Sequence, residues 1–268
     1  MLQKACEKCV ELIEYDQEVK QMIQSVDRAT RILELFLDKS SLSLTEISHE
    51  TQLSKSTVSG LVSTLECKGY LDRQPQSLRY VLGPMLLRLG ALYSKRLDYK
   101  NLAHEHLVAL CEQTGMTVNM AILNGTNVIY LDNLNPEGMV SLDTKAGSVM
   151  PAHCVATGKA LLAQLSDDEL IALYQDYQFE RYTPRTIQSL HDLIVELSMT
   201  RERGYAIDNF ESDARTFGVS MVVRDAYGDK PFAISAGEVA ADRDLVISEH
   251  NLALLRQTIE QITQRLGA

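Results

Sequence analysis

Residues 53–70 read LSKSTVSGLVSTLECKGY, and this stretch decides how the first part of the chain folds. Ser54 is a favourable N-cap residue, and the apolar positions after it repeat at i, i+3, i+4 and i+7: Val58, Leu61, Val62 and Leu65. The opposite side of the predicted helix carries small polar side chains and is nearly free of acids. Such a face fits the major groove of DNA, where bulky or acidic side chains would clash with or repel the phosphates.

Two shorter helices are predicted before this one. Apolar residues recur at helical spacing from Val26 to Phe36, and Ser43 and Glu46 have the Ser-x-x-Glu spacing of a capping box, which opens a second helix. A break at residues 51–53 separates that helix from the third. The spacing therefore predicts a helix-turn-helix within residues 22–83.

A short hairpin is predicted after the third helix. Gly69 ends the helix, and residues 70–73 and 78–82 have strand-forming sequences on either side of a turn. The candidate DNA-binding residues are Thr45, Ser54, Lys55, Ser56, Thr57, Ser59, Ser63, Arg73 and Arg79. Two alternatives remain open: the helices form a bundle that uses the third helix for protein contacts, or Arg79 is simply a solvated strand residue.

The charge of the 268-residue chain is unevenly divided. The whole chain carries 26 basic and 36 acidic side chains; residues 1–98 hold 13 of each, so that 13 basic and 23 acidic remain in residues 99–268. An acidic body cannot lie along a polyanion, whereas a neutral domain with a local basic strip can. The charge distribution favours DNA contacts by the first part of the chain.

The sequence shows no sign of an export or membrane signal. The first twenty residues interrupt every apolar run with Lys or Glu, and no run of about 18 predominantly apolar residues occurs. The cysteines follow no disulfide pattern: Cys6, Cys9, Cys67, Cys111 and Cys154. We therefore expect a cytoplasmic protein with free thiols.

Two further segments flank the predicted DNA-binding domain. Pro84 can start a linker helix over residues 84–101, and residues 1–21 have the pattern of a helical extension with Cys6 and Cys9 on one face. A zinc site would need two more ligands, which the sequence does not place nearby, so we expect no metal.

Residues 102–268 alternate helical and strand patterns. Helices are predicted up to Thr114, at 154–164, 167–174 and 187–203 and from Asp244, and strands at 117–123, 127–134, 139–144, 205–210, 218–224 and 231–237. This order predicts an α+β domain with a largely antiparallel sheet. It contains no strand-GxGxxG-helix unit and no Walker loop, so no nucleotide chemistry and no cofactor are expected.

The segment at residues 147–160, GSVMPAHCVATGKA, predicts a loop that leads into a helix. Ala156, Thr157 and Gly158 fall in the first turns of that helix. Small residues and unpaired N–H groups at a helix start favour a small carboxylate, which the Thr157 hydroxyl would assist. Tight packing of the helix on the sheet would also select Ala and Gly, so the residues alone leave both interpretations open.

Four segments of the first part resemble the IclR (isocitrate lyase regulator) family of bacterial transcription factors: SVDRATRILELF, LSLTEIS, LSKSTVSGLVSTLECKGYL and YVLGPMLLRLG. The resemblance continues through residues 147–160, RGYAIDNFE, GVSMV and FAISAG, and covers roughly residues 22–268. It implies a ligand-responsive regulator that is not an enzyme and is more often a repressor. Residues 102–268 would form a GAF-like effector domain, the DNA would be a near-palindromic operator, and the chain would assemble as a homodimer or tetramer.

The resemblance also implies a site for a small organic acid or sugar-derived metabolite. Its lining residues would be Met139, His153, Ala156, Thr157, Asp208, Met221 and Ser235. The backbone at Ala156 and Thr157 would hold a carboxylate, while Asp208 and Ser235 would orient hydroxyls. The alternative is that Asp208 and Glu211 are solvated strand carboxylates.

The sequence departs from the family pattern at two places. Ser59 and Gly60 stand where many members have a basic or bulky residue, so no base preference can be carried over. Met221 stands where several members have a polar residue, which favours a longer or less polar ligand.

A rival class of function is a metabolite-binding protein or a thiol enzyme that binds no DNA. His153 and Cys154 are adjacent, which suggests a nucleophile with its base. Neighbours on a helix point about 100° apart, however, and no third residue is evident to orient the imidazole.

Overall fold

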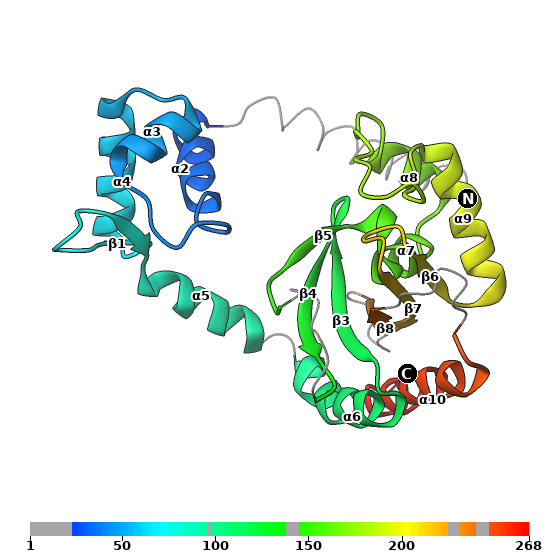
Figure 1. The fold of residues 1–268 in the computed structure, drawn as a ribbon. Helices are drawn as coiled ribbons and strands as arrows, with labels where there is room; N and C mark the ends of the chain where they lie inside the picture. The colour runs from blue at the N-terminus through cyan, green and yellow to red at the C-terminus, as the bar shows by residue number, and fades with distance from the viewer. Residues whose placement is uncertain (1–22, 96–97, 138–144, 225–230, 240–246, 268) are drawn as a thin grey trace, which may run out of the picture. The chain divides into compact units, whose positions relative to one another are not determined.

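The structure is a computed structural model that describes residues 23–95, 98–137, 145–224, 231–239 and 247–267. The chain divides between Arg96 and Leu97 into two compact units, each with its own hydrophobic core (Figure 1). The predicted extension at 1–21 and the predicted strand at 139–144 lie outside the described residues.

The described part of the first unit, residues 23–95, consists of three packed helices, a two-stranded hairpin and a fourth helix. The elements are α2 (Gln24–Glu34), α3 (Leu44–Thr51), α4 (Lys55–Cys67), β1 (Leu71–Arg73), β2 (Tyr80–Leu82) and α5 (Pro84–Lys95). The core is formed by one apolar face of each of α2, α3 and α4, where Ile32, Ile47, Val58 and Val62 are fully buried. The helix-turn-helix expected from the sequence is therefore present.

Local caps set where α3 and α4 begin. Ser43 Oγ accepts a hydrogen bond from the Glu46 N–H at 3.3 Å, and Glu46 Oε2 accepts one from the Ser43 N–H at 2.7 Å, which completes the capping box. Ser54 Oγ accepts the Thr57 N–H at 3.3 Å at the start of α4. Gln52 ends α3 in a left-handed conformation with φ 56°, so the chain turns sharply between the two helices.

The hairpin is extended by one more segment of backbone. β1 and β2 pair antiparallel, with Leu71 opposite Leu82. On the other edge of β2, the Leu42 N–H donates to the Tyr80 carbonyl at 3.0 Å and the Tyr80 N–H donates to the Leu42 carbonyl at 2.7 Å. β2 is therefore hydrogen-bonded on both sides, to β1 and to the segment that precedes α3.

The second unit is built on a six-stranded antiparallel sheet in the order β5-β4-β3-β8-β7-β6. The strands are β3 (Thr117–Asn124), β4 (Asn127–Leu134), β5 (Val149–Pro151), β6 (Ala206–Asn209), β7 (Thr216–Val223) and β8 (Phe232–Val239). The helical elements are α6 (Asp98–Thr114), η2 (Ala152–Cys154), α7 (Ala156–Leu162), α8 (Asp167–Leu173), α9 (Leu190–Arg203) and α10 (Glu249–Arg265).

Helices cover both faces of this sheet (Figure 1). α6 and α10 pack on one face over large side chains such as Val219 and Ile234. α7, α8 and α9 pack on the other face, where Ala121, Ala206 and Ala233 leave room for them. Successive strand residues alternate between the two cores, as the geometry of a strand requires. The unit is the α+β domain that the sequence predicts.

The segment around residue 155 differs from the predicted single helix. Val155 is extended, with φ −117° and ψ 146°, and it separates the one-turn helix η2 from α7. The short strand β5 immediately before η2 pairs with β4, with Asn127 opposite Pro151. A three-residue strand has too few positions to show a period of two, so the sequence pattern did not reveal it.

The described cysteines Cys67, Cys111 and Cys154 are free thiols. The described residues bring together no group of His, Cys, Asp or Glu side chains that would hold a metal ion. None of the described helices has the length and apolar character needed to cross a membrane.

Candidate functional site

The polar face of α4 lies on the surface of the first unit. Lys55, Ser56, Ser59 and Ser63 are exposed, while Val58, Val62 and Leu65 on the opposite side are buried in the core. Thr45 of α3 is also exposed. The structure thus exposes along α4 four of the nine residues that the sequence nominated for DNA.

Hydroxyl groups are linked at the start of this face. Ser54 Oγ lies 3.0 Å from Ser56 Oγ and 2.9 Å from Thr57 Oγ1, within hydrogen-bonding distance of both. Ser54 also caps the helix, so its side chain serves the start of α4 directly. Ser56 and Thr57 are thereby held next to Lys55 at the helix N-terminus, where backbone N–H groups favour a phosphate.

The two arginines of the hairpin have different surroundings. Arg73 is exposed, and its guanidinium lies 5.9 Å from the centre of the Tyr80 ring. Arg79 is half-buried; its Nε donates to Ser41 Oγ at 2.9 Å, and one terminal nitrogen donates to the Ser41 carbonyl at 2.9 Å and lies 2.8 Å from Glu46 Oε2. The donors of Arg79 are therefore engaged by groups of the protein at a partly exposed position.

The Glu46 carboxylate both caps α3 and forms an ion pair with Arg79. Its Oε2 accepts the Ser43 N–H and pairs with Arg79. The hydrogen bond from the Ser43 backbone, followed by those from the Ser43 hydroxyl and Arg79, lowers the pKa of Glu46 to about 2. Glu46 is consequently ionised at every pH at which the protein would be handled.

In the second unit, small polar residues gather on the sheet face beneath α7. The register places Ala206, Ser220, Ser235 and Asn119 in one row across β6, β7, β8 and β3. Ser220 Oγ donates to the Ile234 carbonyl at 2.9 Å, and Asn119 Nδ2 lies 3.5 Å from Ser235 Oγ. In the next row, Gly218 and Gly237 face each other and leave that part of the sheet without side chains.

The structure brings some of the nominated effector residues together and separates others. Asp208 and Ser235 lie on the α7 side of the sheet, because they alternate with Ile207 and Ile234, which belong to the opposite core. Thr157 and Ala156 are buried in α7 itself. Met221 lies on the far face, packed in the core formed with α6 and α10.

Met221 therefore does not belong with Asp208, Ser235 and Thr157, and its apolar character reflects packing rather than a ligand. Met139 lies outside the described residues. Thr157 Oγ1 is buried and meets no hydrogen-bond geometry among the described residues, but it lies near enough to the buried Tyr130 hydroxyl to oppose the burial-driven rise of the Tyr130 pKa.

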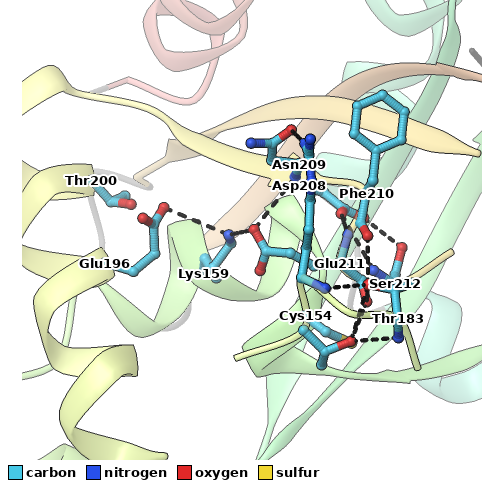
Figure 2. A network of polar contacts seen from close by, with 12 residues as sticks. Cys154, Lys159, Thr183, Glu196, Thr200, Asp208, Asn209, Phe210, Glu211 and Ser212 are labelled. Atoms are coloured by element: carbon cyan, nitrogen blue, oxygen red, sulfur yellow. Dashed lines mark hydrogen bonds and ion pairs between the residues drawn. The ribbon is translucent and has the colours of Figure 1, made fainter. Parts of the chain in front are cut away.

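Asp208 is buried, which excludes the solvated position that the sequence left open. Its Oδ1 accepts the Glu211 N–H at 2.8 Å, and its Oδ2 accepts the Ser212 hydroxyl at 2.5 Å (Figure 2). Burial raises the pKa of Asp208, although these hydrogen bonds and Lys159 oppose the shift. Asp208 thus fixes the loop that follows β6.

Glu211 is also buried, and its partner is a cation (Figure 2). Lys159 of α7 is 0% exposed, and its Nζ donates to Glu211 Oε1 at 2.5 Å and lies 3.6 Å from Glu196 Oε1 of α9. Glu211 Oε2 has no hydrogen-bond partner in the described structure. Burial raises the pKa of Glu211 to about 7, against the opposing effect of Lys159.

At Gly158 the structure gives a packing reason for the small residue. A Cβ placed there would lie 2.2 Å from the Ala152 carbonyl oxygen and 2.4 Å from its Cα. The backbone of η2 therefore packs directly on α7 at this position. Close packing, rather than approach of a ligand, explains the glycine.

His153 and Cys154 are not arranged as a nucleophile and its base. The Cys154 thiol donates to the Pro151 carbonyl at 3.3 Å, and burial raises the pKa of that thiol far above its ordinary value. His153 is fully buried, its Nδ1 lies 3.3 Å from the Tyr177 hydroxyl, and its ring packs edge-on against Tyr177 and Phe179. His153 is a member of an aromatic cluster.

Two family descriptions match this chain. "IclR helix-turn-helix domain" matches residues 25–75, and "Bacterial transcriptional regulator IclR C-terminal" matches residues 91–264. The chain belongs to the IclR family. Members of this family are transcriptional regulators that bind DNA, not enzymes.

Known proteins resemble the chain over nearly its whole length. The HTH-type transcriptional regulator XynR of Escherichia coli K12 is 34% identical over 241 residues, which cover 90% of this chain and 94% of XynR. The HTH-type transcriptional repressor AllR of the same organism is 27% identical over 249 residues, covering 91% and 90%. A crystal structure of an IclR homolog from Microbacterium hydrocarbonoxydans, complexed with 4-hydroxybenzoate, has the same fold, with a TM-score of 0.77, 22% identity and coverage of 91% and 99%.

The sequence interpretation of this IclR-family chain missed Ser220. It lies in the row between Ala206 and Ser235, fully buried on the α7 side of the sheet. Val219, Met221 and Val223 belong to the opposite core, so the alternation along β7 carries the signal that Ser220 faces the other way.

Proposed function

We propose that this IclR-family regulator represses transcription by binding a near-palindromic operator, and that a small-molecule carboxylate bound in the second unit modulates this binding. The protein would act in the cytoplasm as a homodimer or tetramer. The observation that carries the DNA part is the exposed face of α4, where Lys55 lies beside exposed serines and no acidic residue occurs from Lys55 to Ser63. The relative AllR, itself named a repressor, supports the repressor role.

A selection from genomic DNA tests this proposal. Purified protein would be incubated with sheared genomic DNA of its own source at moderate salt, and the bound fragments would be sequenced. We expect a short set of fragments that share a near-palindrome, and the neighbouring genes would indicate the regulated pathway. Recovery of random fragments, both with and without added cell metabolites, would contradict the proposal.

Replacement of Lys55 tests the placement of α4 on DNA. Lys55→Ala should weaken binding to all DNA sequences and reduce the slope of log K against log salt by about one, because one phosphate contact is lost. Lys68→Ala is the matched control, since Lys68 is an exposed lysine at the C-terminal end of the same helix. Equal slopes for Lys55→Ala and the wild type would remove Lys55 from the interface.

The effector part of the proposal is supported by the sheet face beneath α7. The Thr157 hydroxyl is buried close to the Tyr130 hydroxyl, and Ser235, Ser220 and Asp208 lie on the same side of the sheet. A neighbour of the same fold holds 4-hydroxybenzoate, a small carboxylate. Ala156 and His153 stay candidate neighbours of the ligand.

Thr157→Val is the sharpest test of this site, because it removes the hydroxyl and preserves the shape of the side chain. We expect the variant to bind the operator like the wild type but to lose its response to the effector. The probes would be 4-hydroxybenzoate and a set of sugar-derived acids, followed by operator affinity with and without each acid. Thr157→Ser, which keeps the hydroxyl, is the control; a full response of Thr157→Val would exclude Thr157. Asp208→Ala is less informative, since it would also loosen the loop that Asp208 fixes.

The coupling needed for regulation is small. A ligand that changes operator affinity by a factor of 10 to 100 requires only about 1.4–2.7 kcal/mol of differential binding between two arrangements of the protein.

A further inference from the structure

We infer that Arg79 acts on DNA binding indirectly, by fixing the hairpin β1–β2 to the start of α3 through Glu46, and that it is not itself a phosphate contact. This inference rests on the proposed function, because it concerns how the DNA-binding unit is held in shape for its operator. It assigns Arg79 and Glu46 as positioning residues.

The geometry of the Arg79 guanidinium carries the inference. It makes three contacts with the short segment Ser41–Glu46, which leads into α3. These are the Ser41 hydroxyl at 2.9 Å, the Ser41 carbonyl at 2.9 Å and Glu46 Oε2 at 2.8 Å. A planar guanidinium can satisfy several acceptors at once in a fixed orientation, which a point charge cannot. To contact a phosphate with these donors, Arg79 would have to release Ser41 or Glu46.

Glu46 is fixed in turn by the helix that it caps. The same Oε2 accepts the Ser43 N–H at 2.7 Å, so its position follows from the start of α3. The two backbone hydrogen bonds between Leu42 and Tyr80 lie next to this ion pair. Backbone and side chains therefore connect β2 to the same short segment, Ser41–Glu46.

This connection fixes the position of the hairpin β1–β2, and of its exposed Arg73, relative to α3. Arg73 is at the end of β1, opposite Tyr80 in the β1–β2 register, and it is exposed. If β2 moved relative to α3, Arg73 would move relative to α4, and the two could no longer meet the same stretch of DNA backbone. Phosphate contacts fix the register of a protein on DNA, so their relative placement matters for affinity.

Removal of the Glu46 charge separates this inference from simple electrostatics. Loss of an acidic charge from a DNA-binding unit should strengthen binding to a polyanion. Glu46→Gln keeps an acceptor for the Ser43 N–H and releases Arg79, so we expect its operator binding to be about tenfold weaker because the hairpin is misplaced. Glu50→Gln is the matched control: Glu50 is an exposed acid of the same helix that pairs with Lys39, and we expect its loss to leave affinity equal or higher.

Two replacements of Arg79 complete the experiment. Arg79→Ala and Arg79→Lys should both weaken operator binding to about the same extent as Glu46→Gln. The slope of log K against log salt should fall by the same amount in Arg79→Ala as in Glu46→Gln, because both variants lose only the phosphate contact of Arg73. In the Arg79→Ala background, Arg73→Ala should have little further effect, since Arg73 is already out of place. The DNA probes would be a fragment recovered in the genomic selection and a random duplex of equal length, and thermal unfolding would verify that each variant is folded.

Three results would overturn the inference. They are a slope that falls further in Arg79→Ala than in Glu46→Gln, wild-type affinity in Arg79→Lys, or tighter binding in Glu46→Gln to the degree seen in Glu50→Gln. Each of these requires a wild-type protein that selects specific fragments. A wild-type protein that selects none would instead overturn the proposed function, so the two failures are distinguishable.

Discussion

Lys159 is the buried cation on which the Glu211 carboxylate depends. The folded-state pKa of Glu211, about 7, lies above its ordinary value of 4.5, because burial disfavours the charged form. Glu211 therefore contributes stability that is fully present below pH 4.5 and is lost as the pH rises through about 7. Lys159 limits this loss by favouring ionised Glu211.

Lys159→Met should make the second unit less stable, and more so at high pH. The replacement removes the partner of a buried carboxylate, a change that typically costs about 3–5 kcal/mol, and it raises the pKa of Glu211 further. Urea unfolding of the full chain at pH 5 and pH 8 would measure the effect, and the destabilisation should be larger at pH 8. In Lys159→Met/Glu211→Gln the extra loss at pH 8 should disappear; its persistence would show that another group titrates.

Among the helix residues, Gly60 of α4 and Gly158 of α7 differ in the space that surrounds them. A Cβ on Gly60 would meet nothing within 4 Å, whereas one on Gly158 would overlap the backbone of Ala152. Gly60→Ala should therefore stabilise the first unit by about 1 kcal/mol and weaken operator binding, since the added methyl lies on the face of α4 that we propose for DNA. Gly158→Ala should destabilise the second unit by about 1–3 kcal/mol, because η2 or α7 must shift.

Thermal unfolding and operator titration of both variants would check these opposite signs. Unchanged DNA affinity of Gly60→Ala would mean that the groove does not approach the helix at this point.

The helices and the hairpin of the first unit were predicted from signals between residues that are close in the sequence. The caps at Ser43 and Ser54 act between residues three positions apart, and Pro84 and Gly69 impose their own backbone preferences, so none of them needs tertiary contacts. The elements that the sequence described less well, β5 and the division of η2 from α7, depend on pairing with β4 and on contact with Gly158. Those causes are distant in the chain.

The predicted effector residues show the same limit. The alternation of strand residues indicates that Met221 and Ser220 face opposite ways, but it does not say which face α7 will cover. Only the packing of α7 over Ala206 and Ala233 settles that Ser220 lies beneath it and Met221 does not. Likewise, the partner of Arg79 could not be predicted, because Glu46 is 33 positions away and is brought near by the Leu42–Tyr80 bridge.

For the whole molecule, exposed apolar side chains on α5 favour assembly. Leu87, Leu92 and Tyr93 have exposed fractions of 76%, 62% and 51% in the single chain. Exposed apolar clusters of this kind are typical of protein interfaces. A near-palindromic operator also requires two DNA-binding units, which a dimer through α5 would supply.

Leu87→Glu should therefore convert the protein to a smaller assembly and weaken its binding to a full operator by about a hundredfold, because two linked half-sites no longer act together. Binding to an isolated half-site should change little. Sedimentation and titration with both DNAs would test this, and Arg88→Glu, a charge change at an exposed neighbouring position, is the control. An unaltered assembly would place the interface elsewhere.

The hydrogen bonds between Leu42 and Tyr80 also affect whether neighbouring copies of the protein on DNA can pair through their hairpins. An unpaired strand edge is a template for pairing with another chain and leads to aggregation. On the edge of β2 away from β1, Leu42 occupies both backbone groups of Tyr80, and β1 is only three residues long and includes the charged residues Asp72 and Arg73. Hairpins of neighbouring copies therefore present little edge for mutual pairing, and the regulator can accumulate at its operator without aggregating through them.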